Sequence, residues 1–245
     1  MSNLTNCKMS KLFLGRSLSS GVLQTKLCEN IIFSKQGIDT FREAVSSKSL
    51  PKFRKVNKLE KGITNYSVLV PFVSPNGKEE ELHLLYTKRA AFLRSHSREI
   101  CFPGGKVEEN ETLEIAALRE TREELSIPEE SVQIIASLQP VPTRKGKGIV
   151  TPLVGIVKDI TTIKPCTEEV ERTILVPLSE LIDESTLGYT QFKFNENSGG
   201  YSLPVYRTNS QDRIWGMTAI MTYQVLTTLL NRNLYRHRIP YQPPY

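Results

Sequence analysis

The sequence predicts an α+β fold, because strands come first, one helix interrupts them and another helix follows the last of them. Residues 66–73 and 82–87 are rich in strand-forming side chains and flank a turn signal at 75–78, so they predict a β-hairpin. Further strands are expected near residues 132–138, 149–157 and 172–176.

Three segments have helical character. Residues 37–47 predict a short helix, and the mostly apolar residues 214–231 predict a helix packed on the sheet. Between Pro103 and Pro128 there is no proline, and the middle of this stretch consists of good helix formers. A polar loop is expected around residues 199–200, before the last helix.

The composition excludes several classes of protein. At 245 residues, with 39% hydrophobic and 24% charged residues, the chain suits one globular domain plus a tail. No run of 18 apolar residues occurs, so no membrane span is expected. Cys7, Cys28, Cys101 and Cys166 form no C-x-x-C pair, which argues against a zinc site or a disulfide framework.

The net charge of +6 is concentrated near the N-terminus. Residues 1–62 hold 12 Lys/Arg and 4 Asp/Glu, a net of +8, whereas the remaining 183 residues hold 20 and 22, a net of −2. The first 28 residues contain no acid, which is typical of a mitochondrial presequence. The alternative is a solvated basic tail on a peroxisomal or cytoplasmic protein. Because few aromatic side chains lie among these bases, no nucleic-acid partner is expected.

Three carboxylates share one arc of the helix predicted between the two prolines. Glu120, Glu123 and Glu124 lie at i, i+3 and i+4, a spacing at which like charges repel. A divalent cation relieves this repulsion, and Mg²⁺ and Mn²⁺ prefer oxygen ligands. The alternative is a solvated acidic face. An apolar stripe beside the acids favours the metal site, because it turns the acids toward the core.

The acids belong to a longer pattern, G-x5-E-x7-R-E-x-x-E-E, that resembles the signature of the Nudix hydrolases. Its positions are filled by Gly105, Glu111, Arg119, Glu120, Glu123 and Glu124. Thr121 replaces an aliphatic residue of the family pattern, and Ser126 replaces a glycine, so Ser126 must end the helix without glycine's freedom at positive φ.

The resemblance implies a Nudix-type α/β/α sandwich with a mixed sheet, and hydrolysis of a nucleoside diphosphate linked to another group. It also implies Mg²⁺ or Mn²⁺ at Glu120, Glu123 and Glu124, with the Gly105 carbonyl as a further ligand. Glu111 and Arg119 are expected to be structural.

A second motif lies upstream of the first. Thr87, Arg89, Ala90, Arg94 and the Phe102–Gly105 run are similar to the motif of coenzyme A pyrophosphatases within the Nudix family. Tyr86 and Arg98 depart from it, Arg98 standing where a glycine is expected. The similarity implies coenzyme A or a derivative as substrate, with Arg89 and Arg94 binding its phosphates. The alternatives are another nucleotide (a damaged nucleoside triphosphate, a dinucleotide or capped RNA) and a non-catalytic binding module.

Two glutamates are candidates for the general base that takes a proton from the attacking water. Glu123 is expected on the helix and Glu169 on a later loop, and the helical residue is preferred because its backbone is fixed.

These patterns divide the chain into four parts. Residues 1–35 are expected to form a basic tail or targeting segment, 36–62 a short helix and linker, 63–235 the Nudix hydrolase domain, and 236–245 a C-terminal tail. No sequence signal indicates an oligomeric state.

Overall fold

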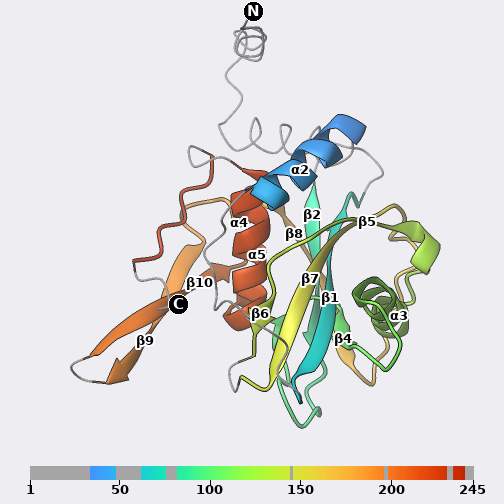
Figure 1. The fold of residues 1–245 in the computed structure, drawn as a ribbon, viewed down its shortest axis with the longest axis horizontal. Coiled ribbons are helices and arrows are strands. Elements are labelled where there is room, and N and C mark those ends of the chain that lie inside the picture. The colour runs from blue at the N-terminus through green and yellow to red at the C-terminus, as the bar shows by residue number, and fades with distance from the viewer. Residues whose placement is uncertain are drawn as a thin grey trace, which may run out of the picture.

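A computed structural model of the chain describes residues 34–47, 62–75, 82–143, 146–195, 198–230 and 234–240, without the side chains of 193–195 and 198–200. An eight-stranded sheet lies at its centre, with helices on both faces (Figure 1). The segment 1–33 and most of the turn expected at 75–78 lie outside the described residues.

The central sheet is mixed. Its strands are β1 (Thr64–Val73), β2 (His83–Arg89), β3 (Ile100–Cys101), β4 (Gly104–Lys106), β5 (Val132–Ser137), β6 (Val141–Pro142), β7 (Gly148–Val157) and β8 (Val170–Pro177). The main order is β3-β2-β1-β7-β5, with β4 paired to β1, β6 to β7 and β8 to β2. Strands β1 and β7 run parallel over nine residue pairs, and the other pairs are antiparallel. The predicted hairpin of β1 and β2 is therefore confirmed.

Helices cover both faces of this sheet. They are α2 (Lys35–Ser47), α3 (Leu113–Leu125), α4 (Leu178–Leu181) and α5 (Gly216–Leu229), with a 3-10 turn η1 (Glu129–Ser131) after α3. Alternate residues of β1 point to opposite faces: Val68, Val70 and Phe72 pack with α2 and α5, whereas Leu69 and Val73 pack beside α3. The expected α/β/α sandwich is confirmed.

The expectation of a polar loop around Gly199 and Gly200 was wrong. Both glycines lie in β10 (Ser198–Arg207), which pairs with β9 (Leu187–Asn195) and with β11 (Arg213–Ile214) in a second, antiparallel sheet. The β9–β10 hairpin projects from the body of the molecule (Figure 1). A projecting hairpin buries less of its surface than a core strand, so its sequence lacks the apolar run that marks the other strands.

Local contacts explain where α3 begins and ends. The Thr112 hydroxyl accepts a hydrogen bond from the Ile115 backbone N–H at 3.2 Å, which caps the first turn. Ser126 ends the helix with φ of 59° and ψ of 22°, and its N–H donates to the Arg122 carbonyl at 2.8 Å. Serine therefore takes the left-handed conformation for which the family pattern has glycine.

Both ends of the described chain pack against the domain. Phe41 of α2 is 1% exposed, and Arg42 Nε donates to the Ile135 carbonyl at 2.9 Å. Near the C-terminus, the Tyr206 and Tyr235 hydroxyls share a hydrogen bond of 2.5 Å, and His237 Nε2 donates to the Gly188 carbonyl at 2.7 Å. The four-part division of the chain remains a prediction.

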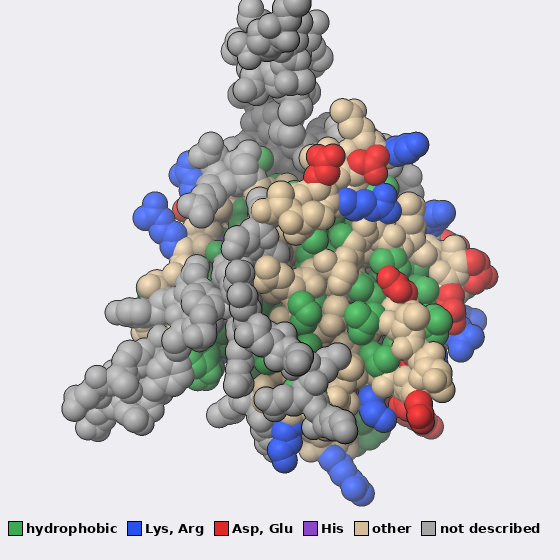
Figure 2. Space-filling model, in the orientation of Figure 1, with side chains coloured by type: hydrophobic (Ala, Val, Ile, Leu, Met, Phe, Trp, Pro, Cys, Tyr) green, Lys and Arg blue, Asp and Glu red, His purple; other side chains and the backbone are tan. Residues whose placement is uncertain are grey.

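The charged side chains are dispersed. On the face drawn in Figure 2, Lys and Arg side chains lie around the edge with acidic side chains between them, and they form no continuous basic band there. Across the described ranges, we find no helix with the length and apolar character needed to cross a bilayer.

Candidate active site

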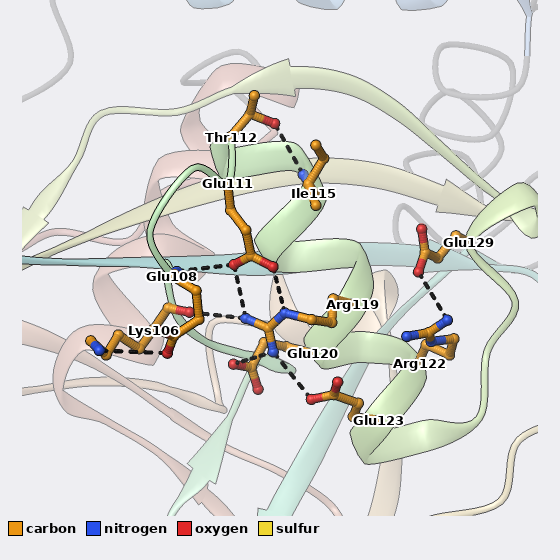
Figure 3. Close-up of polar contacts among 10 residues, drawn as sticks. All are labelled: Lys106, Glu108, Glu111, Thr112, Ile115, Arg119, Glu120, Arg122, Glu123 and Glu129. Atoms are coloured by element: carbon orange, nitrogen blue, oxygen red, sulfur yellow. Dashed lines mark hydrogen bonds and ion pairs between the residues drawn. The ribbon is translucent and has the colours of Figure 1, made fainter.

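Arg119 lies at the centre of the charged cluster on α3 (Figure 3). Its Nε and Nη2 donate to the two carboxylate oxygens of Glu111, at 2.7 and 3.1 Å. Its Nη1 donates to Glu120 Oε1 at 3.0 Å and to Glu123 Oε2 at 3.1 Å. The Lys106 carbonyl oxygen accepts from Nη2 at 3.1 Å. One guanidinium thus joins the loop before the helix to three carboxylates.

Glu111 fixes the turn that leads into α3. Besides the two bonds from Arg119, its Oε2 accepts the Glu108 backbone N–H at 3.0 Å. The Arg119 hydrogen bonds, followed by this N–H, lower the pKa of Glu111 below its usual value. Both oxygens of the Glu111 anion are therefore already bound by groups of the protein. These contacts support the structural role expected for Glu111 and Arg119.

Glu120 lies against Gly105 of β4. A Cβ atom on residue 105 would come within 2.4 Å of Glu120 Oε1, so any side chain there would displace the carboxylate. Burial raises the pKa of Glu120, the Arg119 hydrogen bond and charge oppose that rise, and the charges of Glu123 and Glu169 add to it. Glycine at 105 thus leaves the Glu120 carboxylate free to lie directly against β4.

Glu124 is the most deeply buried of the acids. It is 3% exposed, and its Oε2 has no hydrogen-bond partner. Burial raises the pKa of Glu124 to about 8; Arg89 opposes the rise, and the charges of Glu169 and Glu120 increase it. The ionised form of Glu124 therefore needs positive charge beyond what the protein supplies.

Glu169 lies beside these acids although it belongs to the connection between β7 and β8. Its carbonyl oxygen accepts the Ala90 N–H at 2.8 Å, and its own N–H donates to the Cys166 carbonyl at 3.0 Å. The Cys166 N–H in turn donates to the Glu124 carbonyl at 2.8 Å. These bonds tie the segment to both β2 and α3, a restraint that sequence reasoning missed because it comes from tertiary contacts.

The donor set fits a hard divalent cation. Across the residues that the structure covers, no three Asp, Glu, His or Cys side chains already form a metal-ligand cluster. Glu120 and Glu123 are turned toward Arg119, while a buried oxygen of Glu124 lacks any partner. Carboxylate oxygens are the ligands that Mg²⁺ and Mn²⁺ prefer, and a cation would favour the ionised forms of Glu120 and Glu124 against the burial and the neighbouring charges that raise their pKa values.

Three arginines lie on β2 and on its connection to β3. Arg89 is half-buried, its Nε has no hydrogen-bond partner, and its charge lowers the pKa of Glu124. Arg94 and Arg98 are exposed. Arg98 has φ of 61°, in the left-handed region that favours glycine, so it adopts the backbone conformation of the glycine expected there. The structure thus brings Arg89 to the acids and places Arg94 on the adjoining loop.

Sequence reasoning gave no role to Cys101, which lies below the acids. Its Sγ is 3.1 Å from Thr87 Oγ1. Burial raises the pKa of the Cys101 thiol to about 11, the Thr87 hydrogen bond lowers it, and the charge of Glu124 raises it. The sequence signal that could have drawn attention to Cys101 is its position directly before the Phe102–Gly105 run. A thiol that stays protonated at neutral pH adds no negative charge beneath Glu124.

The chain is similar to known proteins over most of its length. Residues 64–196 match the NUDIX domain family. The chain is 32% identical over 228 residues to Nudix hydrolase 3 of Caenorhabditis elegans, which covers 86% of this chain and 92% of that protein. It is 37% identical over 171 residues to the mitochondrial coenzyme A diphosphatase NUDT8 of Homo sapiens, covering 66% of this chain and 68% of that protein.

Among solved structures, a MutT/nudix family protein from Enterococcus faecalis covers 79% of this chain and 73% of its own, with 14% identity and a TM-score of 0.46. The family match extends over more than half of the chain, and the relative from Caenorhabditis elegans aligns with most of it. The chain therefore belongs to the Nudix hydrolase family, whose enzymes hydrolyse phosphoric anhydride bonds.

Proposed function

We propose that this enzyme hydrolyses the pyrophosphate of coenzyme A or one of its derivatives, giving 3′,5′-ADP and a 4′-phosphopantetheine product. The observation that carries the proposal is the placement of Arg89 beside Glu124, with Arg94 on the loop that continues from it. Similarity to the coenzyme A diphosphatase of Homo sapiens supports the same substrate class.

The charge of coenzyme A suits this arrangement. Its 3′-phosphate adds negative charge beyond the pyrophosphate, and arginine binds phosphate oxygens through paired hydrogen bonds. Arg89 has an unpartnered Nε close to the acids, so it is assigned to the pyrophosphate. Arg94 is exposed on the loop and is assigned to the more distant 3′-phosphate.

Hydrolysis requires a water to attack one phosphorus while the bond from that phosphorus to the bridging oxygen breaks. A cation held by Glu120, Glu123 and Glu124, with the Gly105 carbonyl as a further ligand, would neutralise the pyrophosphate and make water more acidic. Arg119 holds Glu120 and Glu123 in place by its hydrogen bonds. A carboxylate of the protein takes the proton from the attacking water.

Glu169 is favoured as that base over Glu123, the residue preferred on sequence grounds. The preference for Glu123 assumed that a loop residue is loosely held, but backbone hydrogen bonds to Ala90 and Cys166 restrain Glu169. Glu123 is half-exposed, and its Oε2 already accepts a hydrogen bond from Arg119 Nη1. The charge of Glu169 contributes to the raised pKa values of both Glu120 and Glu124, so its carboxylate lies near both.

A different nucleotide substrate has less support than it had on sequence grounds. The best argument for such a substrate was Arg98, which replaces the glycine of the coenzyme A motif. Because Arg98 adopts the left-handed conformation, the departure leaves the loop backbone in a shape that glycine would also take. A non-catalytic role has no support from the acids, since Glu120, Glu123 and Glu124 are all retained.

Residues 1–35 are proposed to direct the enzyme to mitochondria, because their first 28 residues lack acids and the relative from Homo sapiens is named as mitochondrial. These residues fused to a fluorescent reporter should co-localise with a mitochondrial marker. A fusion in which Lys8, Lys11, Arg16 and Lys26 are changed to glutamine is the control and should stay diffuse. Diffuse signal from the unaltered fusion would reduce the segment to a solvated tail.

Replacing either acid nearest the core should abolish cation binding. Glu120→Gln and Glu124→Gln keep the side-chain shape and remove the charge, so turnover should fall by at least about 100-fold while the thermal unfolding of the metal-free protein is retained.

Because the pKa of Glu124 is raised to about 8, a cation competes with a proton below that pH, and wild-type Mn²⁺ affinity should increase from pH 6.5 to 8.5. Calorimetric titration with Mn²⁺ in the absence of substrate measures the affinity of the wild type and of the variants. Full Mn²⁺ binding by both Glu120→Gln and Glu124→Gln would contradict the assignment of these residues as ligands.

The base is identified by comparing Glu169→Gln with Glu123→Gln. Loss of a general base typically lowers turnover about 10²- to 10⁴-fold, so Glu169→Gln should fall in this range and Glu123→Gln should lose less. Turnover should be measured at saturating Mn²⁺ and across pH, because Glu123 is also a proposed ligand. The reverse order of losses would return the role to Glu123.

Arg94→Ala should impair coenzyme A hydrolysis more than dephospho-coenzyme A hydrolysis. Loss of a charged hydrogen bond costs on the order of 1.5–3 kcal/mol, or roughly 10- to 150-fold in kcat/KM. Arg122→Ala is a matched control, since Arg122 is an exposed arginine on α3 that is paired with Glu129 of η1. An equal loss on both substrates would make Arg94 a scaffold residue, and a wild-type preference for nucleoside triphosphates would overturn the substrate proposal.

A further inference from the structure

Ser67 of β1 is a fully buried serine whose hydroxyl has no partner. Its exposed fraction is 0%, and its Oγ makes no hydrogen bond. A buried hydroxyl without a partner typically costs about 1–3 kcal/mol relative to a satisfied one. A serine in this condition, under the acidic helix, requires an explanation.

The sheet register places Ser67 next to the Glu120 carboxylate. Ser67 and Gly105 are directly opposite partners in the antiparallel pair of β1 and β4, so their side-chain directions share one face. The Glu120 carboxylate fills the space above Gly105, with its three terminal atoms 2.4–2.7 Å from where a Cβ would be. Opposite Cβ positions are about 4.5–5.5 Å apart, so the Ser67 hydroxyl and this carboxylate are neighbours.

Other polar groups near this position are less suitable partners. Thr121 on the overlying helix is 0% exposed, but its hydroxyl already donates to the Ala117 carbonyl at 2.7 Å. Thr151 is the parallel partner of Ser67 on β7, and it is a neutral hydroxyl like Ser67 itself. The Glu120 carboxylate lies above Gly105, directly beside Ser67, and a charged acceptor gains more from a hydroxyl donor than a neutral hydroxyl does.

We propose that Ser67 is a positioning residue, which donates its hydroxyl hydrogen to the Glu120 carboxylate when that carboxylate binds a divalent cation. The inference rests on the proposed metal site. In the structure, Arg119 Nη1 donates to Glu120 Oε1 at 3.0 Å, and the Ser67 hydroxyl has no hydrogen-bond partner. A donor fixed on β1 orients the ligand without adding charge, as outer-shell partners of metal ligands do.

Ser67→Ala removes the hydroxyl with little change of shape. It should raise the dissociation constant of Mn²⁺ by about 10- to 100-fold, the usual effect of losing an outer-shell partner. The measurement is a titration without substrate, followed by the electron paramagnetic resonance signal of free Mn²⁺. Hydrolysis by the variant should recover at saturating Mn²⁺, because the ligands themselves remain.

Ser202 provides a matched control. It is a buried serine on β10, 2% exposed, and its Oγ also lacks a partner. Ser202→Ala should leave the Mn²⁺ isotherm unchanged. Neither alanine variant should lower the unfolding temperature of the metal-free protein, because each removes an unsatisfied buried hydroxyl. Lower stability of Ser67→Ala with an unchanged Mn²⁺ isotherm would show a purely structural role.

Glu120→Gln separates the two proposals. If it abolishes Mn²⁺ binding while Ser67→Ala binds as the wild type does, the metal site stands and the role of Ser67 is refuted. If Glu120→Gln binds Mn²⁺ normally, the proposed metal site itself fails. A weakened isotherm for both Glu120→Gln and Ser67→Ala, with Ser202→Ala unchanged, supports the positioning role.

Discussion

The charge balance of α3 depends on one guanidinium. Arg119 donates to Glu111, Glu120 and Glu123, and it also holds the Lys106 carbonyl of the preceding loop. Because two of its bonds are committed to Glu111, it cannot neutralise the remaining acids fully. Glu124 is the acid it does not reach, and burial raises the pKa of that carboxyl. The helix is thus stable as a folded element while its acidic face remains short of positive charge.

The sheet beneath α3 is divided in the same way. Toward one end, Leu69, Leu85 and Val73 form an apolar cluster with the end of the helix. Toward the acids, the sheet instead presents Thr87 and Cys101. A neutral polar floor of this kind lets carboxylates be buried against a sheet without meeting either hydrocarbon or further negative charge. The buried acids of this site are therefore compatible with the fold because the strands below them change character along their length.

Much of the fold could be predicted from the sequence. Strands at 66–73 and 149–157 have continuous apolar runs because they are central strands covered on both faces. The acid helix was predictable because the spacing of its acids and a composition of good helix formers agree over 113–125. The β9–β10 hairpin was not: Val205 and Tyr206 at the end of β10 are buried, but the paired residues before them form no apolar run, and pairing leaves little trace in composition. Ser126 and Arg98 show that a non-glycine residue can keep a left-handed position, which sequence alone could only pose as a question.

The restraint on Glu169 could not be predicted, and it links two parts of the site. The Ala90 N–H that binds the Glu169 carbonyl belongs to the residue after Arg89, where the loop carrying Arg94 begins. The Cys166 N–H holds the same segment to the end of α3. A displacement of the arginine loop would therefore also move the segment that carries Glu169. Since the positions of reacting groups affect turnover strongly, the phosphate contacts proposed for this loop would influence Glu169, the proposed base, through one backbone hydrogen bond.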